Sequence, residues 1–205
     1  MRKRLLPLPL ILLTPIVLLV IVVVAGVYRF SLDDDDILAK FSAQKQSQNR
    51  VMQEIFNITT PNPWTINVPE THAFALINTI DNHGQWAQGR YSSGSERGQV
   101  SVSIEWLLPI DEHKYLSLMT VSNQGSGVFY YLVSFKYDVN RQRMILANEQ
   151  FIGDRIAIDD FNVKGSEMQL RYRQHRIEQA YSEAPSEAVT SRYRLNEALA
   201  FILLP

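Results

Sequence analysis

The sequence contains no cysteine among its 205 residues. This absence excludes disulfide bonds, thiolate metal sites, a cysteine nucleophile and a lipid-modified N-terminal cysteine. Apolar residues make up 46% of the chain and charged residues 20%, which is normal for a chain that folds around a core. We therefore expect packing and hydrogen bonding alone to hold the folded part together.

An excess of positive charge is absent as well. Lysine and arginine together number 20 and aspartate and glutamate 21, which gives a formal net charge of −1. Nucleic-acid-binding proteins usually carry a marked basic excess. We therefore expect no nucleic-acid partner.

Recognisable metal and cofactor motifs are lacking. The histidines include no pair at the spacing of metal ligands, and no HExxH motif is present. The four consecutive aspartates Asp33–Asp36 carry enough charge to attract a cation, but on a helix they point around the axis and not toward one ion. We predict no bound metal and no cofactor. The histidines are His72, His83, His113 and His175.

Catalytic motifs are lacking too. Ser95 lies in the segment Gly94–Gly98, whose first glycine is adjacent to the serine and not two residues before it, as G-x-S-x-G requires. Two groups of carboxylates are close in sequence, but acid–base catalysis needs a set separation across a cleft that sequence does not show. We predict no catalytic residue, with an enzyme built from these carboxylates as an alternative. The groups are Glu105 with Asp111 and Glu112, and Asp154 with Asp159 and Asp160.

One of these carboxylates has a simpler explanation. Asp154 follows Gly153 and precedes Arg155, which is the composition of a turn. In such a turn the carboxylate accepts hydrogen bonds from backbone N–H groups or from a nearby guanidinium. We predict this structural role for Asp154.

A long uncharged run is present at the N-terminus. It covers about 24 residues, from Leu5 to Tyr28, and about 20 apolar residues suffice to cross a bilayer. Arg2, Lys3 and Arg4 precede it and Asp33–Asp36 follow it, so the positive-inside rule places the N-terminus in the cytoplasm. We predict a basic tip and transmembrane signal-anchor over residues 1–30, in a bacterial inner membrane, with the rest of the chain periplasmic.

A cleaved signal peptide is the alternative. The residues before Gly26 are Val24 and Ala25, which offer a small-residue cleavage site after Ala25. The apolar run is longer than the roughly 7–15 residues of a signal-peptide core, which favours a retained anchor. In either case the remaining chain is exported.

Residues 31–63 are predicted to form a juxtamembrane helical stalk and linker. Ser31 is suited to cap a helix, and Asp33–Asp36 are favourable near a helix N-terminus. Apolar residues then recur at helical spacing over about residues 32–57, although the centre of that range is polar. Pro61 and Pro63 end the segment.

Residues 64–205 have the character of a β domain. Segments rich in β-branched and aromatic residues alternate with short loops such as 123–127, 138–141 and 164–166. Connections this short require antiparallel neighbours, so we predict a mainly β fold with an antiparallel sheet, either curled or sandwiched. The expected strands are 73–80, 100–108, 115–122, 128–137, 143–147, 155–163, 168–173, 190–195 and 198–203.

In two of these segments the pattern of apolar residues indicates which faces of the strand are buried. Both alternating sets of side chains in 128–137 are largely apolar, which is typical of a central strand covered on both sides. In 168–173, Met168, Leu170 and Tyr172 alternate with polar residues, so this strand has one face in water.

Two stretches together resemble a known family. The segment Gly125–Leu132 reads GSGVFYYL and is followed by Phe151–Ile156, which reads FIGDRI. The pair resembles a family of small exported bacterial proteins with an SG-x-FYYL strand followed by an LGDR-type turn, and the segments 183–186 and 192–195 are similar to its C-terminal half. The resemblance covers about residues 99–200, implies an exported β domain of unknown biochemical role and supplies no catalytic residues to carry over. An Asp/Gly-rich loop of such proteins corresponds here to 89–98, which has no aspartate.

Four arginines form a candidate anion-binding face. If segments 168–173 and 190–195 are neighbours, Tyr193 and Leu195 point inward with Met168, Leu170 and Tyr172. The outward face then carries Arg171, Arg173, Arg192 and Arg194. Guanidinium groups bind phosphate, sulfate or carboxylate in bidentate fashion. The alternative is that Glu178, Glu183 and Glu187 neutralise the arginines.

The sequence thus predicts a membrane-anchored periplasmic β domain that acts as a non-enzymatic accessory or interaction protein of the cell envelope. The expected partners are the membrane, through residues 5–28, and an envelope protein. One alternative is a binding module for an anionic lipid headgroup or glycan, or another small anionic ligand, on the arginine face. Another is a small subunit of a larger membrane complex.

Overall fold

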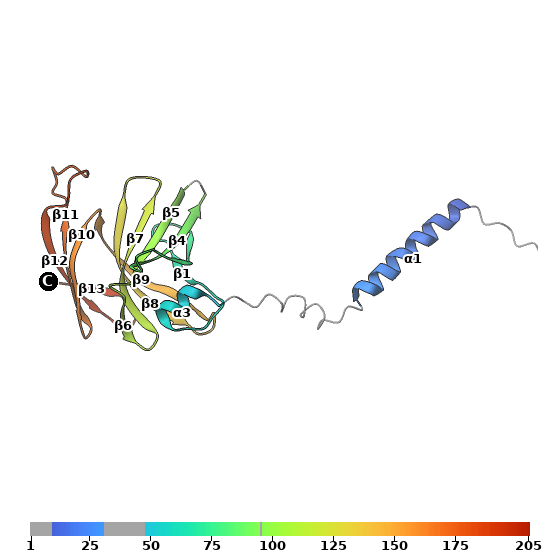
Figure 1. Cartoon of the computed structure of the whole chain (residues 1–205), viewed down its shortest axis with the longest axis horizontal. Helices are drawn as coiled ribbons and strands as arrows, with labels where there is room; N and C mark the ends of the chain where they lie inside the picture. The colour runs from blue at the N-terminus through green and yellow to red at the C-terminus, as the bar shows by residue number, and fades with distance from the viewer. Residues whose placement is uncertain (1–9, 31–47, 95) are drawn as a thin grey trace, which may run out of the picture. The chain divides into compact units, whose positions relative to one another are not determined.

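The computed structural model describes residues 10–30, 48–94 and 96–205. The chain divides into two compact units, residues 1–47 and residues 48–205. The first contains the helix α1 (Leu10–Phe30) (Figure 1). Within the described ranges, no helix is both long enough and apolar enough to cross a membrane. The predicted basic tip and Asp33–Asp36 lie outside the described residues.

The described part of the second unit contains a short helix and thirteen strands, which confirms the prediction of a mainly β fold. The helix α3 spans Arg50–Phe56. The strands are β1 (Trp64–Asn67), β2 (Phe74–Ile77), β3 (Thr79–Ile80), β4 (Trp86–Ser93), β5 (Glu96–Ser103), β6 (Leu108–Asp111), β7 (Lys114–Asn123), β8 (Val128–Asp138), β9 (Arg143–Asp154), β10 (Ala157–Lys164), β11 (Glu167–Gln174), β12 (Glu187–Leu195) and β13 (Phe201–Leu204).

The larger sheet curls until it is nearly closed. Its strand order is β2-β1-β9-β8-β7-β5-β4-β3, and β6 pairs with β7. Because β2 and β3 are separated by Asn78 alone and yet stand at opposite ends of this order, the two edges of the sheet must approach each other. The described pairings are antiparallel apart from that of β1 with β9. A smaller antiparallel sheet, β10-β11-β12-β13, forms a separate layer (Figure 1).

The interior of the curled sheet forms one hydrophobic core, to which α3 contributes. Val51, Met52 and Phe56 of α3 are buried there, and the Phe56 ring lies 4.8 Å from the ring of Trp64. The Asn49 side chain caps the helix by accepting a hydrogen bond from the Met52 N–H at 3.0 Å. Residues 50–56, which we expected in the stalk, are therefore part of the β domain's core.

A second core fills the space between the two sheets. Leu116, Leu118 and Leu132 of the curled sheet pack there against side chains such as Phe161 and Leu170 of the smaller sheet. Since Tyr131, Val133 and Phe135 of β8 enter the first core, β8 is covered on both sides, as predicted. The one-sided pattern of β11 is also confirmed: Met168, Leu170 and Tyr172 are buried, whereas Gln169, Arg171 and Arg173 are exposed.

The sequence prediction differs from the structure at several strands. The expected strand 100–108 is instead the end of β5, a turn and the start of β6, and β9 continues seven residues beyond Ala147, to Asp154. Strand β4 was not expected at all. This last difference matters most, because β4 forms one wall of the candidate site.

Candidate functional site

A groove of about 840 Å³ lies on the outside of the curled sheet, along β2, β4 and β5. Its lining combines apolar, hydrogen-bonding and cationic side chains. None of these lining residues, all of which belong to the described chain, is acidic or a histidine. They are Phe74, Leu76, Asn78, Thr79, Gln88, Gly89, Arg90, Tyr91, Ser92, Arg97, Gly98 and Gln99.

The groove arises where the curled sheet fails to close. Strand β4 pairs with β3 only at Gln88 and Ala87, and β2 pairs with β1. The strand β2 comes close to β4 at Gly89, where an added Cβ would overlap the backbone carbonyl of Leu76. The groove therefore lies between two strand edges that approach each other without joining.

The edge of β4 directs its backbone groups toward β2. The carbonyl of Gln88 accepts a hydrogen bond from the Asn78 N–H at 3.1 Å, so it points away from β5. Backbone groups alternate in direction along a strand, and those of Arg90 and Ser92 consequently point the same way. No strand of the described chain pairs with β4 on that side beyond Gln88.

The β2 wall of the groove is apolar. Ala75 and Ile77 point into the core and are fully buried, whereas Phe74 and Leu76 alternate with them and are 61% and 46% exposed. Native proteins usually protect sheet edges with charge, proline or a covering element. An exposed phenylalanine and leucine on an edge strand are the opposite arrangement and favour a contact surface.

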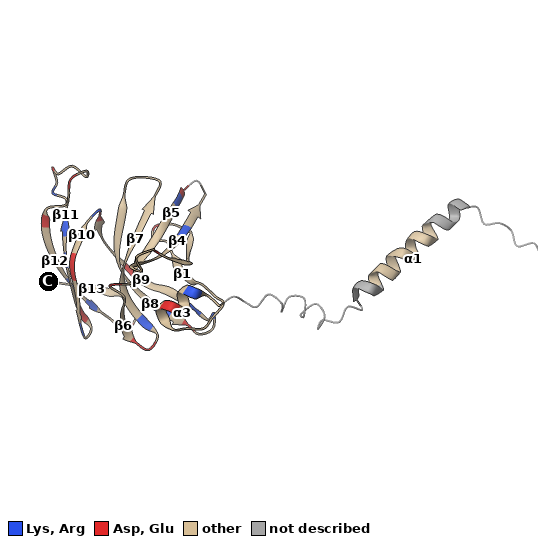
Figure 2. Ribbon diagram, in the orientation of Figure 1, with Lys and Arg blue, Asp and Glu red and all other residues tan. Residues whose placement is uncertain are grey.

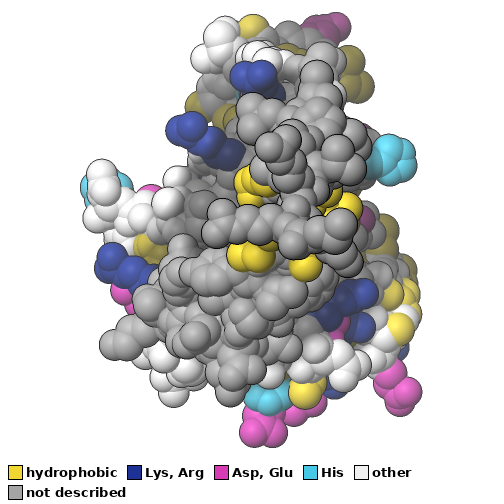
Figure 3. All heavy atoms as spheres, turned by 90° about the vertical axis from the view of Figure 1, so that its right-hand side faces the viewer, with side chains coloured by type: hydrophobic (Ala, Val, Ile, Leu, Met, Phe, Trp, Pro, Cys, Tyr) yellow, Lys and Arg dark blue, Asp and Glu magenta, His cyan; other side chains and the backbone are white. Residues whose placement is uncertain are grey.

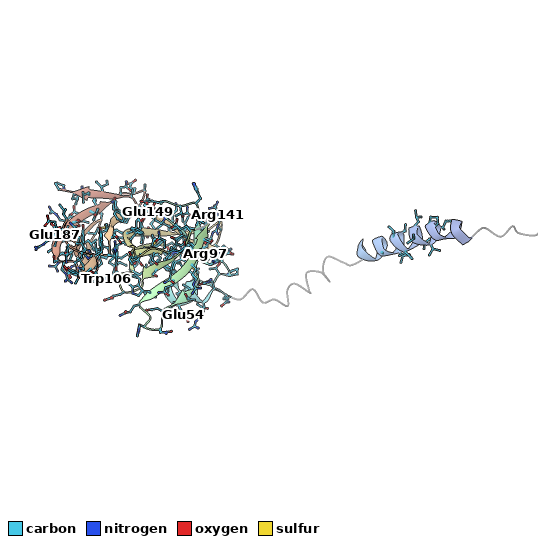
Figure 4. The ribbon with its side chains drawn as sticks, turned by 90° about the horizontal axis from the view of Figure 1, so that it is seen from above. Glu54, Arg97, Trp106, Arg141, Glu149 and Glu187 are labelled. Carbon is cyan, nitrogen blue, oxygen red and sulfur yellow. The ribbon has the colours of Figure 1, made fainter. Side chains whose placement is uncertain are left out.

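The β4–β5 wall is cationic. Arg90 pairs in register with Gln99, and Arg97 pairs with Ser92, so the two arginines are diagonal neighbours on the outward face. Both are exposed, and neither forms an ion pair with a residue that the structure describes. Basic residues are visible on these strands in Figure 2, and Figure 4 places Arg97 on the opposite side of the domain from Glu187.

Tyr91 fixes the inner side of this wall. Its side chain is buried beside the core, and its hydroxyl donates a hydrogen bond to Glu96 Oε1 at 3.1 Å. Burial, followed by the Glu96 hydrogen bond, raises the pKa of Tyr91 to about 12. Gly98 lies opposite in register, and an added Cβ there would overlap the Tyr91 ring. The β4–β5 hairpin is thus a packed support for the arginines above it.

The four predicted anion-binding arginines do share one outward face, as expected, but each already has a partner. Arg171 Nη2 donates to Asp160 at 2.6 Å, Arg173 Nε to Asp159 at 3.1 Å, and Arg194 Nη2 to Glu167 at 2.7 Å. Arg192 Nη2 donates to the backbone carbonyl of Pro205 at 2.5 Å.

The neutralising carboxylates of this face come from β10 and β11 and not from Glu178, Glu183 or Glu187, as the alternative supposed. A small cavity of about 150 Å³ nearby is lined in part by Lys164 and Arg192. Figure 3 views the molecule from the side opposite the smaller sheet, where acidic and basic side chains are interspersed among those that it colours. Anion binding by these arginines stays a prediction.

The predicted structural role of Asp154 is confirmed. Its Oδ1 accepts a hydrogen bond from the Val128 N–H at 2.9 Å, and its Oδ2 accepts from Arg155 Nη2 at 2.7 Å. Arg155 also lies over the Tyr181 ring, 3.7 Å from its centroid. The two stretches that carry the family resemblance therefore meet at the start of β8 and the end of β9, where Phe129 and Asp154 pair in register.

Two of the carboxylates that we considered for catalysis are held by arginines. Asp160 pairs with Arg171, and Asp159 pairs with Arg173. In the part of the chain that the structure describes, no three His, Cys, Asp or Glu side chains come together as metal ligands would. Ser95 lies outside the described residues.

Sequence reasoning missed the groove because it missed β4. A signal was present: Ala87, Gly89 and Tyr91 point inward, while Gln88, Arg90 and Ser92 point outward, which is a two-residue alternation. Glycine and alanine at inward positions made the alternation weak, since neither is enriched in strands.

Comparisons of the chain with family models, with curated proteins and with solved structures found no match.

Proposed function

We propose that this protein is a non-enzymatic interaction module of the bacterial cell envelope, whose β domain binds another envelope component. The observation that carries the proposal is the groove between β2 and β4, whose lining is suited to binding. Exposed apolar side chains, hydrogen-bonding side chains and two arginines without a carboxylate partner among the described residues supply apolar contact, hydrogen bonds and charge to a partner.

The proposal includes an inner-membrane anchor over residues 5–28, with the N-terminus cytoplasmic and the β domain periplasmic. The uncharged run from Leu5 to Tyr28 supports it, and this run begins before the described range that contains α1. About 20 apolar residues suffice to cross a bilayer's hydrocarbon core. The basic residues before the run and the aspartates after it support the orientation.

A second candidate is the binding of an anionic lipid headgroup or glycan by the arginine face of the smaller sheet. The observation that favours it is the small cavity next to Lys164 and Arg192. Against it, three of the four arginines are paired with carboxylates, and a ligand would have to replace these pairs. Binding there is expected to weaken strongly with salt and on Arg192→Glu.

Crosslinking in the native membrane tests the first proposal. The full-length chain is crosslinked in place, purified in mild detergent and analysed by mass spectrometry, and the expected result is a reproducible envelope protein joined to the β domain. A photoreactive residue at Leu76, in the groove, is compared with one at Val139, which is 69% exposed at another loop. Recovery of the chain without a partner, or equal crosslinking from both positions, would contradict the proposal.

A further inference from the structure

We infer that the groove along β2, β4 and β5 docks a protein partner through side chains, and that this partner presents carboxylates beside an aromatic or aliphatic side chain. The inference rests on the proposed function and deepens it, because it names the chemistry of the surface that is bound. Three properties of the groove carry it: cations without a carboxylate partner, exposed apolar side chains beside them, and the residue types that the lining lacks.

The contact has to be made by side chains, because β2 occupies the edge of β4. An added Cβ at Gly89 would overlap the backbone carbonyl of Leu76, so the two strands touch and leave no room for a third between them. The lack of a side chain at Gly89 permits this close approach. It brings the exposed side chains of Phe74 and Leu76 alongside β4, where they form the apolar strip of the groove.

The two cations of the groove have no carboxylate partner among the described residues. Arg90 is in register with Gln99, and Arg97 lies two residues before Gln99 on β5, so the Cα atoms of the two arginines are roughly 7–8 Å apart. By contrast, Arg171 on the smaller sheet is held by Asp160. Two guanidinium groups at this spacing are suited to two neighbouring carboxylates of a partner, each held in a bidentate pair.

The composition of the lining favours a protein partner over a membrane surface. Its charged side chains are Arg90 and Arg97, its exposed aromatic ring is Phe74, and none of its described residues is lysine, aspartate or glutamate. Protein interfaces are enriched in arginine and aromatic residues and depleted of lysine and acidic residues. Surfaces that recognise anionic lipids usually carry clusters of about four to eight basic residues, which the groove does not have.

The apolar strip makes the requirement for an acidic partner stronger. A partner that covers Phe74 and Leu76 also removes water from the arginines beside them, and a guanidinium that loses water without gaining an anion is destabilising. A neutral or basic partner is therefore disfavoured. A carboxylate is instead held more tightly beside apolar side chains, because the effective dielectric constant there is lower.

The test uses the full-length chain in nanodiscs of neutral lipid, together with short fluorescent peptides. One peptide carries two glutamates separated by one residue and flanked by phenylalanines, and two others carry glutamine or lysine in place of glutamate. A fourth is the glutamate peptide with ester linkages in place of backbone amides, which removes its backbone donors. Fluorescence anisotropy measures the affinity of each peptide over a range of salt concentrations.

We expect the glutamate peptide to bind about tenfold more tightly than the glutamine and lysine peptides, and less tightly as salt is raised. The ester peptide should bind within about twofold of the glutamate peptide, because backbone pairing, which gives affinity in strand addition, is not involved. Equal affinity for the glutamate and lysine peptides, or an affinity that salt does not change, would overturn the inference.

Charge reversal separates recognition from a loss of folding. Arg90→Glu and Arg97→Glu should each weaken binding of the glutamate peptide about tenfold and strengthen binding of the lysine peptide, a reversal that a misfolded chain would not show. Arg176→Glu is the matched control at an exposed arginine outside the groove, and it should leave both affinities unchanged. If Arg176→Glu has the same effect as the groove variants, net charge explains the binding and the inference is wrong.

Crosslinking in the native membrane distinguishes failure of this inference from failure of the proposed function. Arg90→Glu combined with Arg97→Glu should reduce crosslinking of the partner from a photoreactive residue at Leu76. Undiminished crosslinking in that variant would leave the proposed function standing and refute this inference, whereas no crosslinked partner with the unaltered chain would refute both. If no peptide binds and the same variant loses attachment to vesicles of anionic lipid, the occupant is a lipid headgroup and the inference is wrong.

Discussion

Trp64 lies in the interior of the curled sheet, fully buried and in edge contact with two other rings. The centroids of Phe56 and Phe135 are each 4.8 Å from that of Trp64. Its indole N–H has no hydrogen-bond partner in the described structure, and a buried donor without a partner costs about 1–3 kcal/mol. The stability that Trp64 provides is therefore due to ring volume and aromatic contact.

This reasoning predicts that Trp64→Phe is much less destabilising than Trp64→Ala. Phenylalanine keeps aromatic contact and removes the unpaired donor, so we expect a loss of about 1 kcal/mol, against about 3–5 kcal/mol for alanine. Urea unfolding of the full-length variants measures both. If the two substitutions cost the same, the indole nitrogen has a role that the packing does not explain.

Two buried tyrosines predict a loss of stability in alkaline solution. Burial raises the pKa of Tyr91 and of Tyr131 to about 12, with Glu96 contributing at Tyr91, and Glu70 and Glu149 at Tyr131. Because both values exceed the ordinary 10.0, the folded chain binds more protons than the unfolded chain between pH 10 and pH 12. The free energy of unfolding should therefore be unaffected below this window and fall as pH rises through it.

Phenylalanine substitutions isolate this effect. Tyr91→Phe and Tyr131→Phe should each reduce the slope of unfolding free energy against pH in the alkaline window, measured by urea unfolding. Tyr181→Phe is the matched control, since Tyr181 is 57% exposed. An unchanged slope in both core variants would show that these phenols do not control the alkaline transition.

At the scale of elements, the predictions from sequence succeeded where the pattern was local and strong. Strand β8 has apolar residues on both faces and is covered by both cores, and the Asp154 turn follows from three adjacent residues. The wall formed by β4 was missed because Gly89 and Ala87 carry little side chain to reveal an inward face. The contact of β2 with β4 depends on the closure of a whole sheet, which no local pattern encodes.

Helix α3 was also misjudged, because a local pattern does not show what a helix packs against. The last part of the stripe that suggested a stalk is the buried face of this helix of seven residues, whereas residues 32–47 of the predicted stalk lie outside the described residues. Phe56 touches Trp64 and Tyr115 with ring centroids 4.8 Å apart, so Phe56→Ala should cost about 3–5 kcal/mol. Gln53→Ala, on the exposed side of the helix, should stay within about 0.5 kcal/mol.

Urea unfolding of these two variants distinguishes a core helix from a stalk. A stalk would tolerate both substitutions equally, because neither side chain would be removed from water on folding. Equal stability of Phe56→Ala and Gln53→Ala would therefore return α3 to the linker and move the start of the β domain to Trp64.

For the whole molecule, sequence sufficed for the fold class and for the orientation of the smaller sheet. Tyr193 and Leu195 point inward with Met168 and Leu170, as the alternation predicted. It did not yield the partners of the arginines, since Asp159 and Asp160 reach them across the β10–β11 pairing and not along the chain. The groove was missed for the same reason, because β2 and β4 approach each other only when the whole curled sheet closes.

The N-terminal run and the β domain are expected to have separate roles, the run in membrane attachment and the β domain in partner binding. If the run over residues 5–28 acts only as an anchor, its replacement by an unrelated apolar helix of equal length should leave partner crosslinking from Leu76 unchanged within about twofold. A variant in which a cleavable signal peptide replaces the run should crosslink less, because membrane attachment raises the local concentration of a membrane partner. Loss of crosslinking in the replaced chain would instead assign the contact to the run itself, as in a small subunit packed within a larger membrane complex. Mass spectrometry of the same samples decides the fate of the run: a peptide containing residues before Ala25 shows a retained anchor, and a mature chain starting at Gly26 shows cleavage.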